Sequence, residues 1–198
     1  MVVVMVKEPR PGRVKTRLAR DIGSVAAARW FRGAAGRVIR ALARDPRWRV
    51  TLAVSPDREG LRSRVWPVGP ARLPQGRGDL GERMARLLRI AGRGRPAVLL
   101  GGDIPGASPA RLAEAFAALG RADAVFGPAE DGGFWLVGLS PARAPRAARR
   151  MFEGVAWSRE TTLAEALTAF RDRRTAFCAT LADVDDARGL PRRGAGLR

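Results

Sequence analysis

The sequence contains no histidine and no tyrosine, one cysteine, and two lysines among its 37 basic residues. The absence of histidine excludes Ser-His and Cys-His nucleophiles, histidine general bases and histidine metal sites. The single cysteine, Cys178, excludes an intrachain disulfide and a cysteine zinc cluster. A bound metal ion would therefore need oxygen ligands, a donor set that suits Mg²⁺ or Mn²⁺.

The sequence also lacks a long apolar run. The first such run, residues 2–6, is too short to span a membrane, and no basic segment precedes it as in a signal peptide. We therefore expect a cytoplasmic protein with no membrane span.

The formal net charge is +18, which would suit an anionic partner. The arginines are spread along the whole chain, however, and no basic motif with interleaved aromatic residues is present. The absence of tyrosine further weakens a base-stacking surface. We therefore attribute most of the charge to composition and expect no specific nucleic-acid binding. A non-catalytic basic nucleic-acid-binding protein remains the most distant alternative.

The chain of 198 residues is long enough for one domain with a sizeable core. Apolar runs alternate with helical patterns along its whole length, which predicts an α/β layered fold with a mainly parallel sheet. We assign residues 1–190 to one domain and residues 191–198 to a frayed tail. The expected strands are 2–6, 48–55, 71–73, 97–100, 122–127, 134–139 and 176–181. The expected helices are 25–44, 57–64, 80–88, 109–119 and one that starts at Ser158.

Ligands of such sheets bind beyond the carboxyl ends of the strands. The strand 2–6 leads there into a loop, 7–12, and then into Arg13, Lys15 and Arg17, where a helix is expected to begin. Backbone N–H groups, a helix N-terminus and cationic side chains together favour phosphate binding. Both lysines of the chain, Lys7 and Lys15, lie in this stretch. The segment is not a Walker loop, because the first glycine of that motif is missing.

Asp103 follows the buried strand 97–100 and is flanked by glycines. We interpret it as a carboxylate that places a metal ion against a diphosphate. The alternative is an aspartate that caps its own turn. Asp183, Asp185 and Asp186 form a later acidic cluster, one member of which could complete a metal site with Asp103.

Two further acidic segments leave alternatives open. The segment 130–133 places two carboxylates and two glycines between strands, as in a substrate-lining loop or an acidic hairpin turn. Asp79 and Glu82 have the spacing of a capping box, and we give capping alone the same weight as a contact with a ligand.

Six motifs occur in the same order as in a family of bacterial proteins known as DUF2064, and the similarity extends from Met1 to about Leu190. The motifs are K-x-P-x-x-G-R-V-K-T-R-L, G-x-G-D-L-G-E-R-M, G-x-D-x-P, G-P-A-E-D-G-G, F-x-G-V-x-W-S and D-V-D-D. The sequence thus resembles a family that is often labelled glycosyltransferase and is related to the nucleotide-diphospho-sugar transferase (GT-A) superfamily. It is also similar to 2-phospho-lactate and molybdenum cofactor guanylyltransferases.

The resemblance implies a three-layer, Rossmann-like GT-A sandwich with a mixed, mainly parallel sheet. Taken with the analysis above, it assigns nucleotide and phosphate binding to Lys7, Gly12, Arg13, Lys15, Arg17, Gly78 and Asp79. It assigns metal binding to Asp103 and Asp185, with Mg²⁺ or Mn²⁺ as the cofactor. It assigns acceptor binding to Glu130, Asp131, Gly132, Gly133 and Trp157. The candidate catalytic residues are Lys15, Asp103 and Asp131.

Three departures from the family pattern fall near the expected site. Gly102 stands where threonine is usual, Phe134 where tyrosine is usual, and Arg159 where threonine is usual. The first choice of function is a metal-dependent GT-A-type glycosyltransferase that uses a nucleotide sugar and a small-molecule acceptor. The alternative is a guanylyltransferase-like nucleotidyltransferase that releases pyrophosphate. The oligomeric state is left open, with a homodimer as one option.

Overall fold

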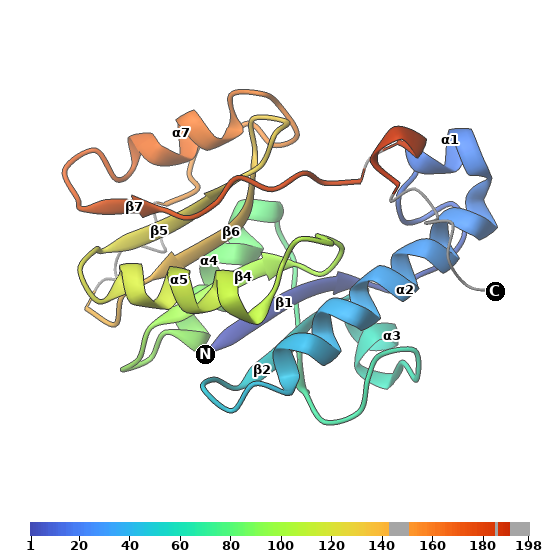
Figure 1. Cartoon of the computed structure of the whole chain (residues 1–198), viewed down its shortest axis with the longest axis horizontal. Coiled ribbons are helices and arrows are strands. Elements are labelled where there is room, and N and C mark those ends of the chain that lie inside the picture. Colours follow the sequence, from blue (N-terminus) through green and yellow to red (C-terminus); the bar gives the residue numbers. More distant parts are fainter. Residues whose placement is uncertain (143–150, 185, 191–198) are drawn as a thin grey trace.

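The structure is a computed structural model that describes residues 1–142, 151–184 and 186–190. Its centre is a seven-stranded sheet in the order β3-β2-β1-β4-β6-β5-β7 (Figure 1). β6 runs antiparallel to both of its neighbours, and the other paired strands are parallel. The predicted α/β fold with a mixed, mainly parallel sheet is therefore confirmed. The strands are β1 (Val2–Lys7), β2 (Val50–Ser55), β3 (Ala71–Pro74), β4 (Ala97–Gly101), β5 (Ala124–Pro128), β6 (Phe134–Leu139) and β7 (Thr175–Phe177).

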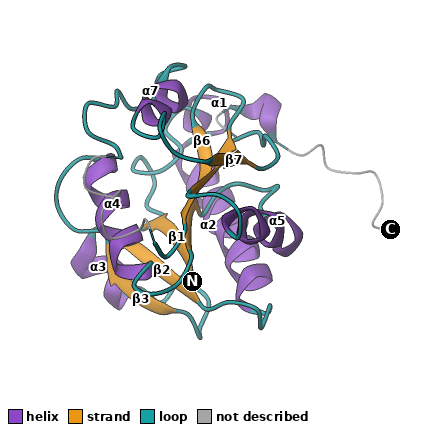
Figure 2. Cartoon of the chain, turned by 90° about the vertical axis from the view of Figure 1, so that its left-hand side faces the viewer, coloured by secondary structure: helices purple, strands orange, loops and turns teal. Residues whose placement is uncertain are grey.

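Helices cover both faces of the sheet and give three layers, as Figure 2 shows with the sheet between α2 (Ser24–Ala43) and α4 (Leu80–Ala91). Alternate residues of a strand point to opposite faces. Val2 and Val4 accordingly pack with α2 and α5, whereas Val3 packs with α4 and α7. The helices are α1 (Leu18–Ile22), α2 (Ser24–Ala43), α3 (Asp57–Arg62), α4 (Leu80–Ala91), α5 (Pro109–Leu119) and α7 (Thr162–Thr168), with a 3₁₀ turn, η1 (Ala187–Gly189).

Two predicted helix starts agree with the structure in detail. Asp79 accepts a hydrogen bond from the Glu82 backbone, and the Glu82 side chain accepts one from the Asp79 backbone, so the capping box before α4 is present. Ser108 caps α5 by accepting from the backbone of Arg111, with Pro109 as the first helical residue. Each cap satisfies N–H groups that the first turn leaves unpaired.

Other predicted boundaries were wrong. The first helix begins at Leu18, after the basic stretch, so Arg13, Lys15 and Arg17 belong to a turn-rich loop and not to a helix. The helix expected at Ser158 begins at Thr162, and Ser158 has a positive φ of 61° that does not suit an N-cap. The last strand is short, although Leu181 still pairs with Ala129 through an isolated bridge.

The chain after β7 crosses the molecule instead of continuing beside its neighbours. It runs along the carboxyl edge of the sheet from β7 to α1, as the red segment of Figure 1 shows. Val184 is buried there with Leu18 of α1 and Ala27 of α2. The backbone of Ala187 donates to the Asp21 carboxylate at 2.9 Å. This crossing brings an acidic segment from the end of the chain to the loop after β1.

The structure bears only in part on two further predictions, the frayed tail and the lack of a membrane span. The expected frayed tail, 191–198, falls outside the described residues. No helix in the described ranges is both long enough and apolar enough to cross a membrane.

Gly60 tests the packing of α3 on the sheet. A Cβ at this position would lie 2.5 Å from Val54 Cβ in β2. We expect Gly60→Ala to lower the free energy of unfolding by about 1–3 kcal/mol, because Val54 Cβ cannot move aside without moving the strand. The matched variant is Gly33→Ala in α2, where the added carbon would meet only the end of Arg37, at 3.5 Å. Gly33→Ala should raise stability by about 0.5–1 kcal/mol through helix propensity. Urea unfolding measures both, and equal effects would contradict this packing.

Candidate active site

Three adjoining hollows line the carboxyl edge of the sheet. One of about 600 Å³ is bounded by the loop after β1, by Asp103 and by the segment 158–160. A second, of about 290 Å³, lies over the ends of β1 and β4 and shares Asp103 with the first. A third, of about 190 Å³, joins the other two through Asp131, Asp183 and Phe134. Together they form one polar cleft with an apolar side, at the edge where ligands of such sheets bind.

Lys15 is the centre of this cleft. Its Nζ lies 2.8 Å from Asp103 Oδ2 and 2.7 and 2.9 Å from the two carboxylate oxygens of Asp183. The Lys15 side chain is 6% exposed, whereas those of Asp103 and Asp183 are 21% and 27% exposed. The ammonium therefore holds two carboxylates from distant parts of the chain at one point.

Burial by itself would lower the pKa of Lys15, because it disfavours the charged form. The carboxylates of Asp103 and Asp183 outweigh burial, and the pKa of Lys15 is raised above its ordinary value. The Nζ also lies 5.9 Å from the centroid of the Trp30 ring, a cation–π contact. Lys15 has a φ of 45°, in the left-handed region that non-glycine residues rarely adopt. Its position thus results from the surrounding contacts and not from local preference.

Asp103 reaches the cleft through the turn that follows β4. The glycine before it, Gly102, has no room for a side chain. A Cβ at Gly102 would lie 2.7 Å from Val6 Cγ1 and 3.1 Å from the Met5 carbonyl oxygen, and its backbone N–H donates to that oxygen. Gly102 therefore lets the turn lie against β1, next to the loop that carries Lys15.

Asp183 reaches the cleft through the crossing segment after β7. Its own Oδ1 accepts from the backbone of Val184 at 2.6 Å, and Val184 is anchored against α1 and α2. The predicted second metal ligand, Asp185, lies outside the described residues. Within that acidic cluster, Asp183 contacts the Lys15 ammonium that Asp103 also binds.

Asp131 stands on the opposite wall, in the turn between β5 and β6. The hairpin interpretation of 130–133 is confirmed, since β5 and β6 pair antiparallel on either side of it. Gly132 has a φ of 81°, and a Cβ there would lie 2.1 Å from the Glu160 carbonyl oxygen. This close approach holds the segment 158–160 against the turn, so both line the same hollow as Lys15.

The residues predicted to bind the nucleotide differ in whether they line the cleft. Lys7, Lys15 and Arg17 line the cleft. Gly12 and Arg13 lie in the same loop, exposed, but outside the lining. The loop before α4 carries Gly78 and Asp79. Its glycine has a φ of 102°, and the Asp79 carboxylate is engaged in the capping box. Their contact with a nucleotide stays a prediction.

The predicted acceptor side is largely aromatic. Gly133 and Trp157 line the third hollow together with Phe134 and Trp135, whereas Glu130 and Gly132 are not part of the lining. The Trp157 Nε1 is buried and has no hydrogen-bond partner in the part of the chain that the structure describes. Trp157 and Phe134 pack edge to face, with ring centroids 6.3 Å apart. Because phenylalanine replaces the usual tyrosine here, position 134 offers no hydroxyl to the hollow.

Several residues in or beside the cleft were not predicted. Trp30 of α2 lies beside Lys15, and this contact has no local signal in the sequence. Ser158, Arg159 and Glu160 were expected at a helix start, and the Gly132 contact that brings them to the cleft joins segments far apart in the sequence. Gln75 also lines the cleft, and its Nε2 donates to the carbonyl oxygens of Val6 and Ala53 at 3.0 and 2.9 Å.

Cys178 takes no part in the cleft. It is half-buried beside β5, and its thiol lies 3.5 Å from the Phe126 carbonyl oxygen. Burial raises the pKa of Cys178 to about 11, so the reactive thiolate is scarce at neutral pH. Within residues 1–142, 151–184 and 186–190, no group of three or more Asp, Glu, Cys or His side chains is arranged to hold a metal.

Residues 38–159 match the bacterial family DUF2064, described as an uncharacterized protein conserved in bacteria, and this match covers more than half of the chain. The chain belongs to the DUF2064 family. The predicted membership of this family is therefore confirmed. No curated protein matches this DUF2064 chain.

Solved structures place this DUF2064 member among nucleotide-dependent transferases in fold. A protein of Desulfovibrio desulfuricans G20, provisionally assigned as a nucleotide-diphospho-sugar transferase, is 27% identical with a TM-score of 0.78, over 93% of this chain and 81% of that one. The 4-diphosphocytidyl-2C-methyl-D-erythritol synthase of Anaerococcus prevotii DSM 20548 is 10% identical with a TM-score of 0.59, over 90% and 86% of the chains. Rv0371c of Mycobacterium tuberculosis H37Rv, in complex with manganese, is 16% identical with a TM-score of 0.52, over 93% and 91%.

The ion cluster can be tested through stability. We expect Lys15→Met to lower the free energy of unfolding by about 2 kcal/mol at neutral pH, since it leaves two carboxylates close together without their cation. The pKa of Lys15 is raised in the folded protein, so its ion pairs contribute their full stability at any pH below the ordinary lysine pKa of 10.5. This contribution is lost only as the pH rises through the raised pKa. The deficit should therefore stay constant between about pH 6 and pH 9.

The matched control for this variant is Lys7→Met. Lys7 is exposed and forms no ion pair within the described residues, so its replacement should change stability by less than about 0.5 kcal/mol. Denaturant unfolding of both variants across that pH range makes the comparison. A Lys15→Met protein as stable as Lys7→Met would show that the cluster does not hold these segments together.

Proposed function

We propose that this DUF2064 protein is a divalent-metal-dependent transferase that acts on a nucleotide-activated substrate. The observation that carries the proposal is the meeting of Lys15, Asp103 and Asp183 at the carboxyl edge of the sheet. A cation beside carboxylates is the pairing that phosphate chemistry needs, with one charge for the phosphate oxygens and the others for a metal ion.

The cationic side of the cleft supports a phosphate-bearing donor. Lys15 and Arg17 come from the loop after β1, and Arg159 faces the same hollow of about 600 Å³. The second hollow extends from Asp103 over Met84 and Phe31 and is mostly apolar, which suits the base or sugar of a nucleotide. In this proposal the diphosphate lies near Lys15 and the rest of the donor lies along the ends of β1 and β4.

The donor set also fits a divalent ion. Asp103 and Asp183 offer hard oxygen ligands that converge on one cation, and Lys15 Nζ stands in for that cation here. Two carboxylates plus phosphate oxygens and water are a common arrangement for Mg²⁺, which seldom has an all-protein cage. When bound, the ion would neutralise charge on the phosphate oxygens. Lys15 must leave the carboxylates as the ion enters, and the donor phosphates are the nearest anions that we expect it to meet.

The opposite wall would hold the acceptor. Asp131 lines the hollow and accepts from the Gly133 backbone with Oδ1 at 3.0 Å, a hydrogen bond that fixes the carboxylate. We assign Asp131 the role of accepting a proton from an acceptor hydroxyl. Trp157 would donate its Nε1–H to an acceptor oxygen, since it lacks another partner among the residues described.

Glycosyl transfer from a nucleotide sugar is the first candidate reaction. The similarity in sequence and fold to the Desulfovibrio protein favours it, within the coarser class of nucleotide-dependent transferases. Nucleotidyl transfer is the second candidate, because the fold is shared with a 4-diphosphocytidyl-2C-methyl-D-erythritol synthase, and Lys15 could equally neutralise an α-phosphate. The two reactions differ in the bond that breaks and therefore in the product released.

A product assay separates these reactions. The protein with Mg²⁺ or Mn²⁺ is incubated with a panel of nucleotide sugars and of nucleoside triphosphates, together with candidate acceptors. Release of a nucleoside diphosphate indicates glycosyl transfer, and release of pyrophosphate indicates nucleotidyl transfer.

We expect Asp103→Asn to lower turnover by at least about a hundredfold, since a metal-binding carboxylate is lost. Asp172→Asn, at an exposed position in the turn after α7, is the matched control and should leave turnover unchanged. Turnover by Asp103→Asn at the wild-type rate would refute the metal assignment.

Metal binding without turnover gives a second test. If Lys15 occupies the cation position, Lys15→Met should bind Mn²⁺ more tightly than the wild type in the absence of nucleotide, by about tenfold. Lys7→Met should bind Mn²⁺ as the wild type does. Electron paramagnetic resonance of free Mn²⁺ during a titration measures the affinities. Loss of the ion from the Lys15→Met/Asp103→Asn double variant locates the site, and retained binding there would place the metal elsewhere.

A further inference from the structure

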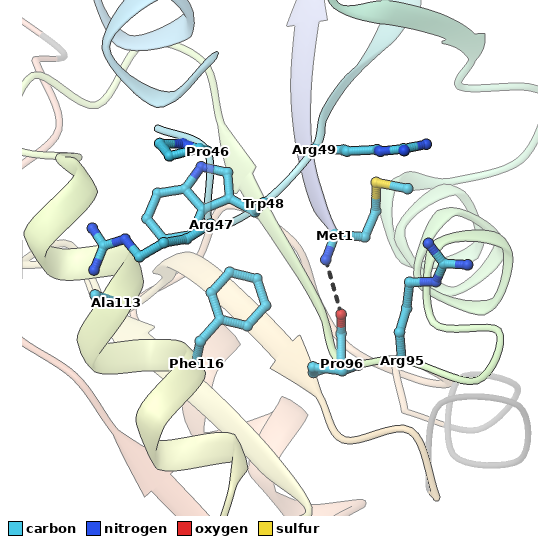
Figure 3. Close-up of a pocket in the computed structure, with 9 residues that line it drawn as sticks. All are labelled: Met1, Pro46, Arg47, Trp48, Arg49, Arg95, Pro96, Ala113 and Phe116. Atoms are coloured by element: carbon cyan, nitrogen blue, oxygen red, sulfur yellow. Dashed lines mark hydrogen bonds between the residues drawn. The ribbon is translucent and has the colours of Figure 1, made fainter. Parts of the chain in front are cut away.

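A separate hollow of about 570 Å³ lies outside the cleft, at the opposite, amino-terminal edge of the sheet, beside α5 (Figure 3). β1 begins at this edge and ends at Lys7, in the candidate active site. At about 3.3 Å per residue, the two sites are about 20 Å apart. The hollow is therefore separate from the cleft that contains Lys15.

One wall of this hollow is aromatic. The rings of Trp48 and Phe116 stack with their centroids 5.7 Å apart and an interplanar angle of 23°. Trp48 Nε1 donates to the Leu42 carbonyl oxygen at 2.9 Å, which fixes the ring. Arg47 lies over the same ring at 4.8 Å from its centroid, and its charge is already compensated by Asp45 at 2.6 Å. This wall is thus held in place and offers apolar surface.

The other side of the hollow is cationic. Figure 3 shows Arg49 and Arg95 extending to the same side of Met1, away from the aromatic pair. The parallel register of the sheet places them there, because Val50 and Val98 both lie beside Val2 and each arginine comes just before one of these strands. Neither guanidinium forms an ion pair with a carboxylate among the residues described here. The charges of both arginines are therefore available to an anion.

The residues that line the hollow include no Asp and no Glu. An adjoining hollow shares Trp48 and Arg49 and adds Arg40 and Arg44 of α2, so the positive potential increases toward this edge. A planar guanidinium binds phosphate oxygens through paired hydrogen bonds, and an aromatic wall accommodates a flat ring. A volume of this size is typical of sites for small molecules.

We propose that this hollow binds a small molecule in which a planar ring system carries a phosphate group, the chemistry of a nucleoside monophosphate. The phosphate lies between Arg49 and Arg95, and the ring lies along Trp48 and Phe116. In this proposal, part of the positive charge of the chain serves to bind one small anionic molecule. This binding does not depend on the reaction in the cleft.

The test uses the whole protein labelled with 5-fluorotryptophan, which reports on each of the five tryptophans by ¹⁹F NMR. The resonance that disappears in Trp48→Phe is the reporter for this hollow. We expect adenosine 5′-monophosphate to shift the Trp48 resonance to saturation. Adenosine lacks the phosphate and ribose 5-phosphate lacks the ring, so each should bind at least about tenfold more weakly.

Matched variants separate the hollow from general charge and from the cleft. Arg49→Gln/Arg95→Gln should weaken binding by at least about tenfold. Arg29→Gln/Arg32→Gln removes the same charge from exposed positions of α2 and should bind as the wild type does. Lys15→Met should also leave the Trp48 response unchanged, whatever reaction the cleft performs.

Four results would overturn the proposal. The first two are a Trp48 resonance that adenosine 5′-monophosphate does not move, and wild-type affinity for this nucleotide in Arg49→Gln/Arg95→Gln. The third is an affinity for ribose 5-phosphate equal to that for the nucleotide. The fourth is an affinity for single-stranded oligonucleotides that rises with their length and falls equally in both double variants. The last result would identify a general polyanion surface in place of a small-molecule site.

Discussion

The ion pairs of Lys15 with Asp103 and Asp183 are the constraint on which the candidate active site depends. They join the loop after β1, the turn after β4 and the segment after β7, which are far apart in the sequence. Without this cation the two carboxylates would repel each other, and the crossing segment beyond Leu181 would keep the apolar contact of Val184 and the hydrogen bond from Ala187 to Asp21. The same interaction therefore shapes the cleft and anchors the end of the described chain.

Local patterns in the sequence were sufficient for most of the sheet. The runs that became β1, β4 and β6 consist of apolar residues between turn signals, and a buried strand needs little else. Helix caps at Asp79 and Ser108 were equally readable, because a cap is a contact within four residues. Boundaries failed where a long-range contact prevailed over local preference, as at Ser158, whose segment is held by the backbone of the 130–133 turn.

The sequence was enough to predict where the candidate site lies and what type of site it is, but not all of the residues that form it. Lys15 lies in the loop after β1 and Asp103 in the turn after β4, and the rule for α/β sheets places such loops at the ligand edge. Placing Asp183 beside Lys15 and Asp103 required the path of the crossing segment, which depends on where Val184 packs. Trp30 could not be identified as a neighbour of Lys15, because a tryptophan at helical spacing has the same pattern whether it packs in the core or beneath an ammonium.

The close contact at Gly132 also limits how this protein can change over evolution. The β5–β6 turn has no room for a side chain at that position, and its backbone is fixed against Glu160 and Leu163. Lengthening the turn would push the 158–160 segment out of the cleft and open the site to solvent. Under the proposed function, new acceptor preferences are therefore more accessible through replacement of side chains such as Phe134 or Arg159 than through loop insertion. Relatives with altered specificity should then share the length of this turn while differing in those two positions.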